Sequence, residues 1–363
     1  MKISPANSQR GIALIMVMAV IFVLGIMAGG FAYSMKVEMK LARNYVSEAE
    51  MEWLGRSGVE LARYVLAQQM NIPGQQGFDA LNQKWAGGIG ETNELLADIS
   101  LDNNQLGSGS FSIKIVDCER KFNINAADLP DLQRAFGLIG LEPMDYAAAV
   151  DSILDWRDPD ENTRMNGAES DYYEGLNPPY PSKNGPFDDL SELLLVRGVT
   201  PEMYWGSAGP NELTRVVAPS LSSSASGTLG FVDKTMFQGG LVDLFTCLSG
   251  GPINVNTATA AALQMIPGID ANAAQEIVRA RAGPDGVEGD EDDAPFRSAQ
   301  EMVMNVPGLN KGLMGAMQRY CAVRSFTFEV HVLAKIGSYQ REYVALLRRN
   351  TPRDVQILYF HGK

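Results

Sequence analysis

The stretch GIALIMVMAVIFVLGIMAGGFAY, residues Gly11 to Tyr33, decides the fold of this chain. It contains no charged side chain, and the first charge after it is Lys36. A bilayer core about 30 Å thick needs roughly 20 apolar residues in an α-helix. A helix also satisfies its own backbone hydrogen bonds in lipid. Residues 12–33 are therefore predicted to cross a membrane as one helix.

The residues before this stretch predict its orientation. They are few and polar, with cations at Lys2 and Arg10. Positive residues hold their end of a span in the cytoplasm, so the chain after Lys36 is expected outside the inner membrane. An ordinary secretory signal cleaved near residues 28–30 is disfavoured, because the apolar stretch is too long for one. A plain single-span anchor remains an alternative.

After the span, apolar residues recur at helical spacing as far as Gln69, which predicts that the helix continues as an amphipathic rod. Residues 110–117, SFSIKIVD, alternate as in a half-buried strand. Near the other end, residues 325–335 and 340–348 predict a hairpin, and residues 354–360 a further strand. These distant strands predict an α+β fold, in which one small antiparallel sheet is interrupted by a large all-α insertion.

The insertion repeats itself in sequence. KFNINAADLPDL at 121–132 is echoed by PINVNTATAAAL at 252–263, and PFDDLSELLLVRGV at 186–199 by PFRSAQEMVMNVPGL at 295–309. The two halves occur in the same order in both copies. Self-similarity of this kind predicts two units of helical hairpins.

Each unit begins with a similar polar position. Asn125 and Asn256 stand where a helix is expected to begin, and their side chains could accept from a free amide of the first turn. The Ser-rich and Gly-rich composition at 218–230 predicts a flexible connector, followed by a helix at 241–248.

The first unit contains the acidic loop DWRDPDENTRMNGAESDYY, which begins at Asp155. Counted from Asp158, oxygen ligands fall at alternate positions and a carboxylate at the twelfth, which is the ligand order of a calcium loop. Thr163 replaces the glycine of an EF-hand, so a calcium loop outside that class is predicted. The alternative is a solvated acidic loop. The candidate ligands are Asp155, Asp158, Asp160, Asn162, the backbone of Arg164, Glu169 and Asp171.

The second unit has a comparable loop, PDGVEGDEDDAPF, at 284–296. Crowded carboxylates repel one another unless a cation lies among them. Asp285, Asp290 and Asp292 are the candidate ligands, although their spacing matches no single pattern. One or two Ca²⁺ ions are therefore expected in the whole chain.

Composition argues against several other functions. The net charge of -13 and the pI near 4.7 disfavour nucleic-acid backbones as partners. The sequence has no G-x-S-x-G, no G-x-x-x-x-G-K-[ST] and no H-E-x-x-H, so no enzyme is predicted. Of the three cysteines, Cys247 and Cys321 bracket the second unit and are the favoured disulfide pair, with three buried thiols as the alternative.

The direct contact between Arg10-Gly11 and the apolar stretch resembles the class III leader of type IV pilins and type II secretion pseudopilins. In those proteins the prepilin peptidase cuts after the glycine and methylates the new amino terminus. The resemblance implies processing between Gly11 and Ile12. Most such subunits carry glutamate at the fifth mature position, where Met16 stands here. A carboxylate in lipid needs a partner, so its absence suits a subunit with no neighbour above it.

Further motifs closely resemble the K family of minor pseudopilins in type II secretion. They are DWRDPDE, GAESDYY, VRGVTPEMY at 196–204, and INVNTA at 253–258. The resemblance implies a non-enzymatic, single-pass inner-membrane subunit with a periplasmic C-terminal domain. It would cap the pseudopilus and start its assembly with the I-type and J-type minor pseudopilins through the N-terminal helix. The major pseudopilin and the prepilin peptidase are further implied partners, with secreted cargo or the secretin as additional contacts.

Two other functions stay open at this point. INVNTATAAALQMIPGIDANAAQEIVRARA at 253–282 resembles a helix-hairpin-helix, which suggests an anchored periplasmic binding or DNA-uptake protein. An anchored hydrolase would use Asp158 or Glu169. The predicted organisation is a leader peptide (1–11), a transmembrane helix (12–33), a pilin-like helix with the first strands (34–118), a first helical unit (119–217), a linker with an extra helix (218–251), a second helical unit (252–323) and C-terminal strands (324–363).

Overall fold

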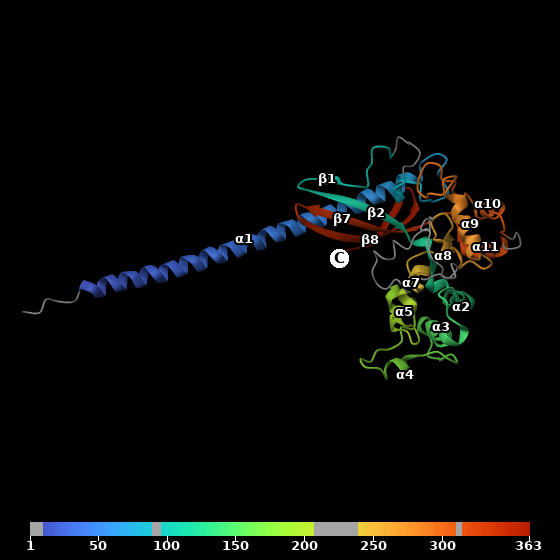
Figure 1. Ribbon diagram of the computed structural model, residues 1–363, viewed down its shortest axis with the longest axis horizontal. Coiled ribbons are helices and arrows are strands. Elements are labelled where there is room, and N and C mark those ends of the chain that lie inside the picture. The colour runs from blue at the N-terminus through green and yellow to red at the C-terminus, as the bar shows by residue number, and fades with distance from the viewer. Residues whose placement is uncertain (1–9, 89–95, 207–238, 310–313) are drawn as a thin grey trace, which may run out of the picture.

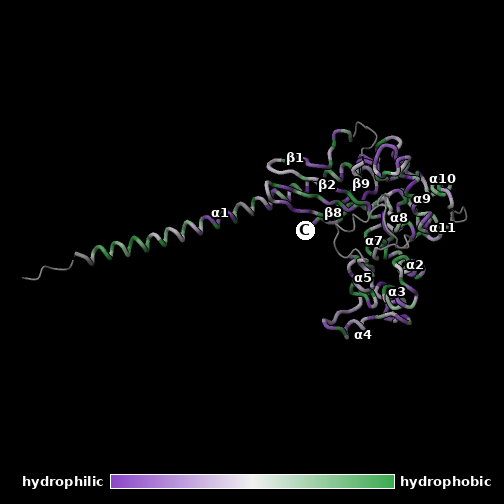
Figure 2. Tube along the Cα trace, in the orientation of Figure 1, coloured by the Kyte–Doolittle hydropathy of each residue, from purple (hydrophilic) through white to green (hydrophobic). Residues whose placement is uncertain are grey.

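The computed structural model describes residues 10–88, 96–206, 239–309 and 314–363, so most of the predicted leader lies outside the described residues. Helix α1 (Arg10–Gln69) is one uninterrupted helix of 60 residues. Its first half extends away from the rest of the molecule, and its second half lies against a sheet (Figure 1). By length and composition this helix could cross a membrane, and Figure 2 shows that the projecting half is largely hydrophobic. The predicted span and rod are thus a single element.

The predicted strands form one sheet. Its five antiparallel strands run in the order β1 (Asn104–Leu106), β2 (Gly109–Asp117), β7 (Thr327–Ile336), β8 (Tyr339–Thr351) and β9 (Asp354–Gly362). Asp117 at the end of β2 lies opposite Phe328 at the start of β7. The insertion therefore leaves and re-enters the sheet at adjacent strand ends, and the predicted interrupted sheet is confirmed.

One face of the sheet packs on the second half of α1. Alternate side chains of the strands point to the helix, as expected from the period of two, and Phe111, Ile113 and Val332 are buried there. Gly58 lets the helix approach closely, because a Cβ at this position would overlap Cγ1 of Val332. Gly55 faces the ring of Tyr343 in the same way, and a Cβ there would lie 2.6 Å from the ring. The helix and the sheet thus form one tightly packed body.

The insertion consists of two helical units that share one hydrophobic core. A 3-10 turn η1 (Lys84–Ala86) precedes β1, and η2 (Cys118–Arg120) leads into the insertion. The first unit contains β3 (Phe122–Asn123), η3 (Ile124–Ala126), α2 (Leu129–Leu138), α3 (Pro143–Arg157), α4 (Ser170–Tyr173), η4 (Leu190–Leu195), α5 (Pro201–Trp205), α7 (Leu241–Leu244) and β4 (Phe245–Thr246). The second contains β5 (Ile253–Asn254), α8 (Ala260–Leu263), α9 (Ala271–Arg281), α10 (Ala299–Asn305), α11 (Met314–Tyr320) and β6 (Cys321–Ala322).

The end of the first unit differs from the prediction. The sequence predicts a linker at 218–251 with a separate helix reaching residue 248, and residues 218–238 lie outside the described residues. However, α7 ends at Leu244, and β4 then pairs in parallel with β3. In the second unit, β6 pairs in parallel with β5 after α11. Residues 241–246 therefore close the first unit, and a two-residue strand is too short to leave a periodic pattern.

The repeated asparagines also have a different role from the predicted cap. The Asn125 side chain donates to the carbonyl of Phe187 at 2.9 Å and accepts from its amide at 2.7 Å. Asn256 makes the same pair of bonds with Phe296, both at 2.9 Å. Each asparagine thus joins the two halves of its unit. The N-caps of α2 and α8 are instead Asp128 and Thr259.

A buried polar junction attaches the insertion to the sheet. One carboxylate oxygen of Asp117, Oδ2, accepts from Ser325 Oγ at 2.6 Å, Thr257 Oγ1 at 2.5 Å and Asn254 Nδ2 at 3.2 Å. Beside it, Glu119 accepts from the backbone amides of residues 250 and 327, both at 3.1 Å. Buried polar groups need such partners, so this cluster fixes where the second unit meets the sheet.

The junction makes the stability of the protein dependent on pH. Burial, and next the charge of Asp117, raise the pKa of Glu119 from 4.5 to about 8. Between these values the folded state binds more protons than the unfolded state. The contribution of Glu119 to the free energy of unfolding is therefore complete below pH 4.5 and is lost as the pH rises through about 8.

We expect Glu119→Gln to flatten this part of the pH profile. The thermal midpoint, followed by circular dichroism between about pH 5 and 9, should fall less steeply in the variant. At the acid end the variant should melt lower, because an amide nitrogen cannot accept one of the two backbone bonds. Glu174→Gln, on an exposed residue, removes the same charge as a control. An unchanged slope in Glu119→Gln would contradict the assignment.

Candidate functional site

The acidic loop of the first unit surrounds two carboxylates at the end of α3. Asp155 lies in the last turn of this helix and is fully buried, and Asp158 follows the helix directly. The ring of Trp156 meets the ring of Tyr173 edge-on, with centroids 5.2 Å apart, and Tyr173 stacks on Tyr180. These rings give the loop a rigid apolar base, so its acidic side chains are held in place.

A single guanidinium balances these carboxylates in the structure. Nη1 of Arg164 lies 2.7 Å from Asp155 Oδ1 and 2.6 Å from Asp158 Oδ2. The loop backbone also closes tightly over the site, since a Cβ on Gly167 would overlap Asp155 Oδ2. The Arg164 guanidinium therefore occupies the place between two acids where a cation would be expected.

Glu169 is a third buried acid of this loop, and one of its carboxylate oxygens has no partner among the described residues. The residue is buried, and its Oε2 accepts from Ser182 Oγ at 3.1 Å. Its Oε1 has no partner among the described residues, and neither does Oδ1 of Asp158. Burial, and then the charges of neighbouring carboxylates including Asp155, raise the pKa of Glu169 to about 7. Unpaired, crowded carboxylate oxygens are ligands that suit a hard cation such as Ca²⁺.

The structure does not gather all of the predicted ligands. Asp160, Asn162 and Asp171 are exposed, and Oδ1 of Asp160 accepts from the loop's own amide at Asn162. The side chain of Arg164 enters the site, where the ligand order predicts only its backbone. Asp155 and Asp158 therefore meet at Arg164, and Glu169 lies close enough for their charges to raise its pKa. Among the described residues these three acids do not bring their ligand oxygens within 4.8 Å of one another, and the EF-hand spacing does not describe their arrangement.

Sequence reasoning missed Glu161, which lies at the edge of this group. Its Oε1 accepts from Asn184 Nδ2 at 2.6 Å and from Ser170 Oγ at 3.1 Å. Its charge is among those that raise the pKa of Glu169. Glu161 falls between the ligand positions of the expected pattern, so only the overall acidity of the loop indicated it.

The second acidic loop brings its three predicted residues together. One oxygen each from Asp285, Asp290 and Asp292 lie within 4.8 Å of one another. The hydrogen bond with Asp292, and next burial and the charge of Asp285, raise the pKa of Asp290 to about 6. Asp285 and Asp292 are exposed, and exposed carboxylates are hydrated without an ion. The second loop therefore has the closer carboxylate oxygens, whereas the first loop has the more deeply buried acids.

The disulfide predicted between Cys247 and Cys321 is absent, because all three cysteines are free. The thiol of Cys247 donates to the carbonyl of Asp188 at 3.1 Å, whereas the thiol of Cys321 lies 3.2 Å from the sulfur of Met317. Cys247 follows β4 of the first unit, and Cys321 begins β6 of the second. Bracketing in sequence suggests proximity, but Cys247 follows the strand pair of the first unit, whereas Cys321 lies in the strand pair of the second.

Comparisons with known proteins show which family the chain resembles. Residues 100–206 match the family model described as "Type II secretion system (T2SS), protein K", and residues 249–320 match a helix-hairpin-helix motif. A type II secretion system protein K from Pseudomonas aeruginosa is 24% identical, over 97% of this chain and 92% of that protein. The predicted resemblance to the type II secretion system protein K family is confirmed.

Another member of the protein K family, from Aeromonas hydrophila, is 29% identical over 54% of this chain, and the match spans 61% of that protein's length. The fold is shared with a chain of the crystal structure titled "GspK-GspI-GspJ complex from enterotoxigenic Escherichia coli Type 2 Secretion System". The TM-score is 0.60 at 15% identity, covering 89% of this chain and 99% of that one. The helix-hairpin-helix match confirms the predicted resemblance of the second unit.

Proposed function

We propose that this chain is a non-enzymatic minor pseudopilin that caps the periplasmic pseudopilus and starts its assembly. This proposal is based on the position of the insertion. In Figure 1 the two helical units lie beyond the end of α1 that is farthest from the projecting apolar half. If parallel α1 helices form the filament, this mass would block any subunit from stacking above. The protein can then occupy only the end of a filament.

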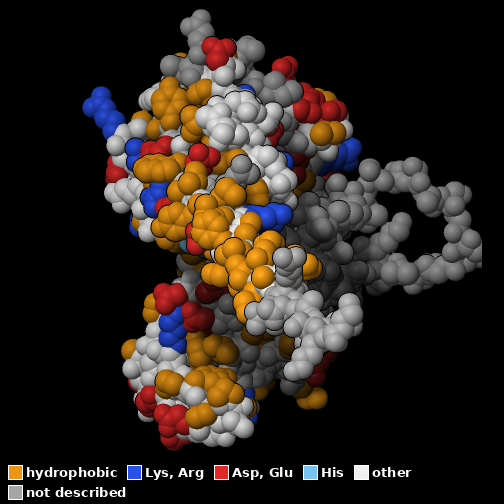
Figure 3. All heavy atoms as spheres, turned by 90° about the vertical axis from the view of Figure 1, so that its left-hand side faces the viewer, with side chains coloured by type: hydrophobic (Ala, Val, Ile, Leu, Met, Phe, Trp, Pro, Cys, Tyr) orange, Lys and Arg blue, Asp and Glu red, His pale blue; other side chains and the backbone are white. Residues whose placement is uncertain are grey.

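The surface of α1 supports association with other subunits through this helix. The side chains of Leu41, Tyr45 and Trp53 are exposed, beyond the segment long enough to span the bilayer. Seen from the side on which α1 projects, hydrophobic side chains gather at the centre of the face, with charged groups of both signs around them (Figure 3). The solved relative forms a complex with GspI and GspJ. We therefore propose the I-type and J-type minor pseudopilins as partners of α1, with the major pseudopilin, cargo and the secretin as further contacts.

A nucleic-acid function has one observation in its favour, the helix-hairpin-helix match at 249–320. Such motifs bind phosphates, which requires positive charge nearby. Residues 253–310 instead carry nine acids and three cations. The charge of this unit would repel a phosphate backbone, and we do not propose DNA as a partner.

Calcium binding by the first acidic loop forms part of the proposed function. Asp155, Asp158 and Glu169 would supply carboxylate oxygens, two of which have no partner among the described residues. Arg164 would have to leave its place between the two aspartates. The proposed role of the ion is structural, since its two positive charges would offset most of the charge of the three acids and fix the loop. A second ion at residues 285–292 is proposed on the clustering of Asp285, Asp290 and Asp292 alone.

The leader proposal predicts a defined mature terminus. Gly11 and Ile12 lie in the first turn of α1, immediately before the exposed apolar segment. Mass spectrometry of the N-terminal peptide should find a methylated Ile12 in cells with the prepilin peptidase and an intact Met1 in cells without it. Gly11→Leu should leave the precursor uncut in both strains. A mature chain that begins after Gly30 would contradict the pseudopilin assignment.

The tip position predicts an asymmetric cross-linking pattern. A photo-cross-linking residue at Tyr45, which is 79% exposed on α1, should capture I-type or J-type minor pseudopilins. The same residue at Met165, which is 97% exposed in the first unit, should capture no major pseudopilin. Regular cross-links from Met165 to the major pseudopilin would place the protein in the shaft and refute the cap.

The calcium proposal predicts stabilisation by the ion. Because a ligand that binds only the native state stabilises it, about 100-fold excess of Ca²⁺ over its dissociation constant should raise the thermal midpoint by several degrees. Chelator should reverse the shift, and Glu169→Gln should abolish it. Asp171→Asn, on an exposed residue of the same loop, is the matched control. A shift that persists in Glu169→Gln would argue against this site.

A further inference from the structure

Two exposed cations follow the apolar segment of α1 on one side of the helix. Lys36 and Lys40 lie four residues apart, so their side chains share a side. Glu38 points to the opposite side, because two residues turn a helix by about 200°. The ion pairs of α1 begin only at Glu48, so neither lysine is paired with a described residue. We call Lys36 and Lys40 the basic stripe.

The basic stripe lies on the side of α1 that packs on the sheet farther along the helix. Lys40 precedes Gly58 by about five helical turns, and Gly58 faces Val332 of β7. In Figure 1 the sheet covers only the second half of α1. Residues 33–42 are all exposed. The stripe therefore faces open space between the sheet and the apolar segment.

This space is at the depth of lipid headgroups if residues 12–33 cross the bilayer. At 1.5 Å per residue, Lys36 lies about 5 Å and Lys40 about 11 Å beyond Tyr33. Each headgroup layer of a bilayer is about 5–8 Å thick. Lysines near the end of a span extend their side chains toward the interface. Both ammonium groups can therefore reach lipid phosphates.

We propose that the basic stripe binds the phosphate of phospholipid headgroups at the end of the span, with a preference for anionic lipids. The ammonium groups of Lys36 and Lys40 donate to the phosphate oxygens in charge-assisted hydrogen bonds. Like charges four residues apart on a helix repel each other, and an anion between them removes this repulsion. The inference rests on the membrane anchoring that the proposed function requires.

Lipid bound at the basic stripe leaves the proposed partner surface of α1 free. Trp53 is exposed and follows Lys40 by a spacing that places it nearly on the opposite side of the helix. The headgroup contacts would therefore fix the depth of α1 and its rotation about its own axis. In that orientation the sheet lies above the lipid on one side, and Trp53 faces away from it.

Photo-cross-linking in vesicles of defined composition tests the proposal. The full chain is reconstituted with equal amounts of phosphatidylcholine and phosphatidylglycerol, and benzoylphenylalanine replaces Tyr33, which shares the side of the stripe. Mass spectrometry gives the ratio of the two lipid adducts. Phosphatidylglycerol, which has no cation in its headgroup, should be enriched about fivefold or more, because each lysine near the surface contributes about fivefold.

A probe on the other side of α1 is the matched control. Phe31 lies two residues before Tyr33 and is exposed to a similar extent, but it points away from the stripe. Benzoylphenylalanine in place of Phe31 should therefore capture the two lipids about equally. In about 1 M salt the enrichment at Tyr33 should fall, because the Debye length shrinks to about 3 Å.

Substitutions assign the enrichment to the stripe. Lys36→Gln combined with Lys40→Gln should bring the adduct ratio at Tyr33 close to one. Lys114→Gln, on an exposed residue of β2, should leave the ratio unchanged. Circular dichroism identifies any variant that loses the helix, and glutamine is a good helix former. Enrichment that survives the double substitution would refute the proposal.

The remaining outcomes separate this inference from the membrane span itself. Equal capture of both lipids at Tyr33 would overturn the basic stripe and leave the span intact. The absence of lipid adducts at both Tyr33 and Phe31 would overturn the span together with the stripe. Loss of the enrichment in millimolar inorganic phosphate, at constant ionic strength, would identify a free anion as the ligand and overturn the headgroup assignment.

Discussion

The contacts of the Asp117 carboxylate hold the molecule in its arrangement. Asp117 is the last residue of β2, and its Oδ2 atom accepts bonds from Asn254 and Thr257 of the second unit and from Ser325 of the segment that returns to β7. One buried acid therefore joins the strand that leaves the sheet, the strand that re-enters it and the unit between them. Burial raises its pKa, and these bonds offset part of that cost by favouring the ionised form. Together with the bonds of Glu119, these contacts attach the insertion to the sheet beyond its two chain connections.

The two helical units share one arrangement of strands and bridging side chains. In each, a short strand pairs in parallel with the strand that follows the last helix, and an asparagine side chain bridges the two halves. An arginine at the end of the long helix then donates to backbone carbonyls near the first strand, Arg157 in one unit and Arg281 in the other. Neither unit is large, and their buried side chains form one continuous core. Pairing the units buries more apolar surface than either could bury alone.

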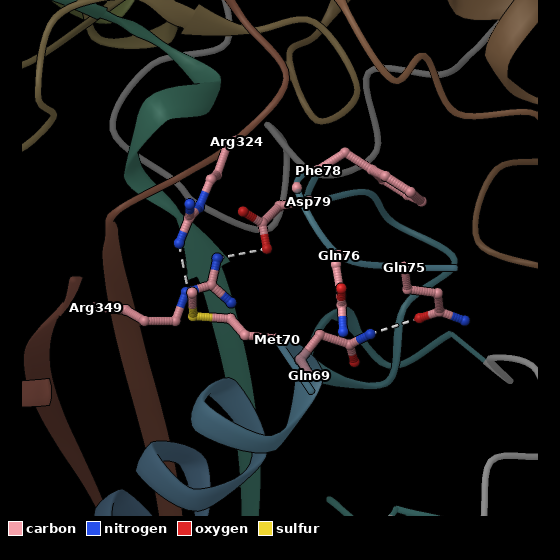
Figure 4. Close-up of a pocket in the computed structure, with 9 residues that line it drawn as sticks. Gln69, Met70, Gln75, Gln76, Phe78, Asp79, Arg324 and Arg349 are labelled. Atoms are coloured by element: carbon pink, nitrogen blue, oxygen red, sulfur yellow. Dashed lines mark hydrogen bonds and ion pairs between the residues drawn. The ribbon is translucent and has the colours of Figure 1, made fainter. Parts of the chain in front are cut away.

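The elements that the sequence predicts best are those with a local signal. The apolar stretch, the helical spacing up to Gln69 and the alternating strand at 110–117 follow from the order of neighbouring residues, and all are present. The missed features depend on residues far apart in the chain. Arg164 as the counter-ion of two acids, the closure of the first unit by β4, and the separation of Cys247 from Cys321 have no periodic pattern. A cavity of about 250 Å³ between Gln69, Arg324 and Arg349 (Figure 4) is of the same kind, because three distant segments create it.

The glycines of α1 divide it into two mechanically different parts. Gly55 and Gly58 are enclosed by side chains of the sheet, whereas a Cβ added at Gly25, Gly29 or Gly30 would meet no described atom within 4 Å. Glycine weakens a helix where no packing supports it. At 1.5 Å per residue the helix is about 90 Å long, and it contains no proline. Flexure is therefore concentrated inside the apolar segment, and the outer half transmits force to the insertion as a stiff lever. An axial displacement of this outer half would therefore carry the sheet and the insertion with it.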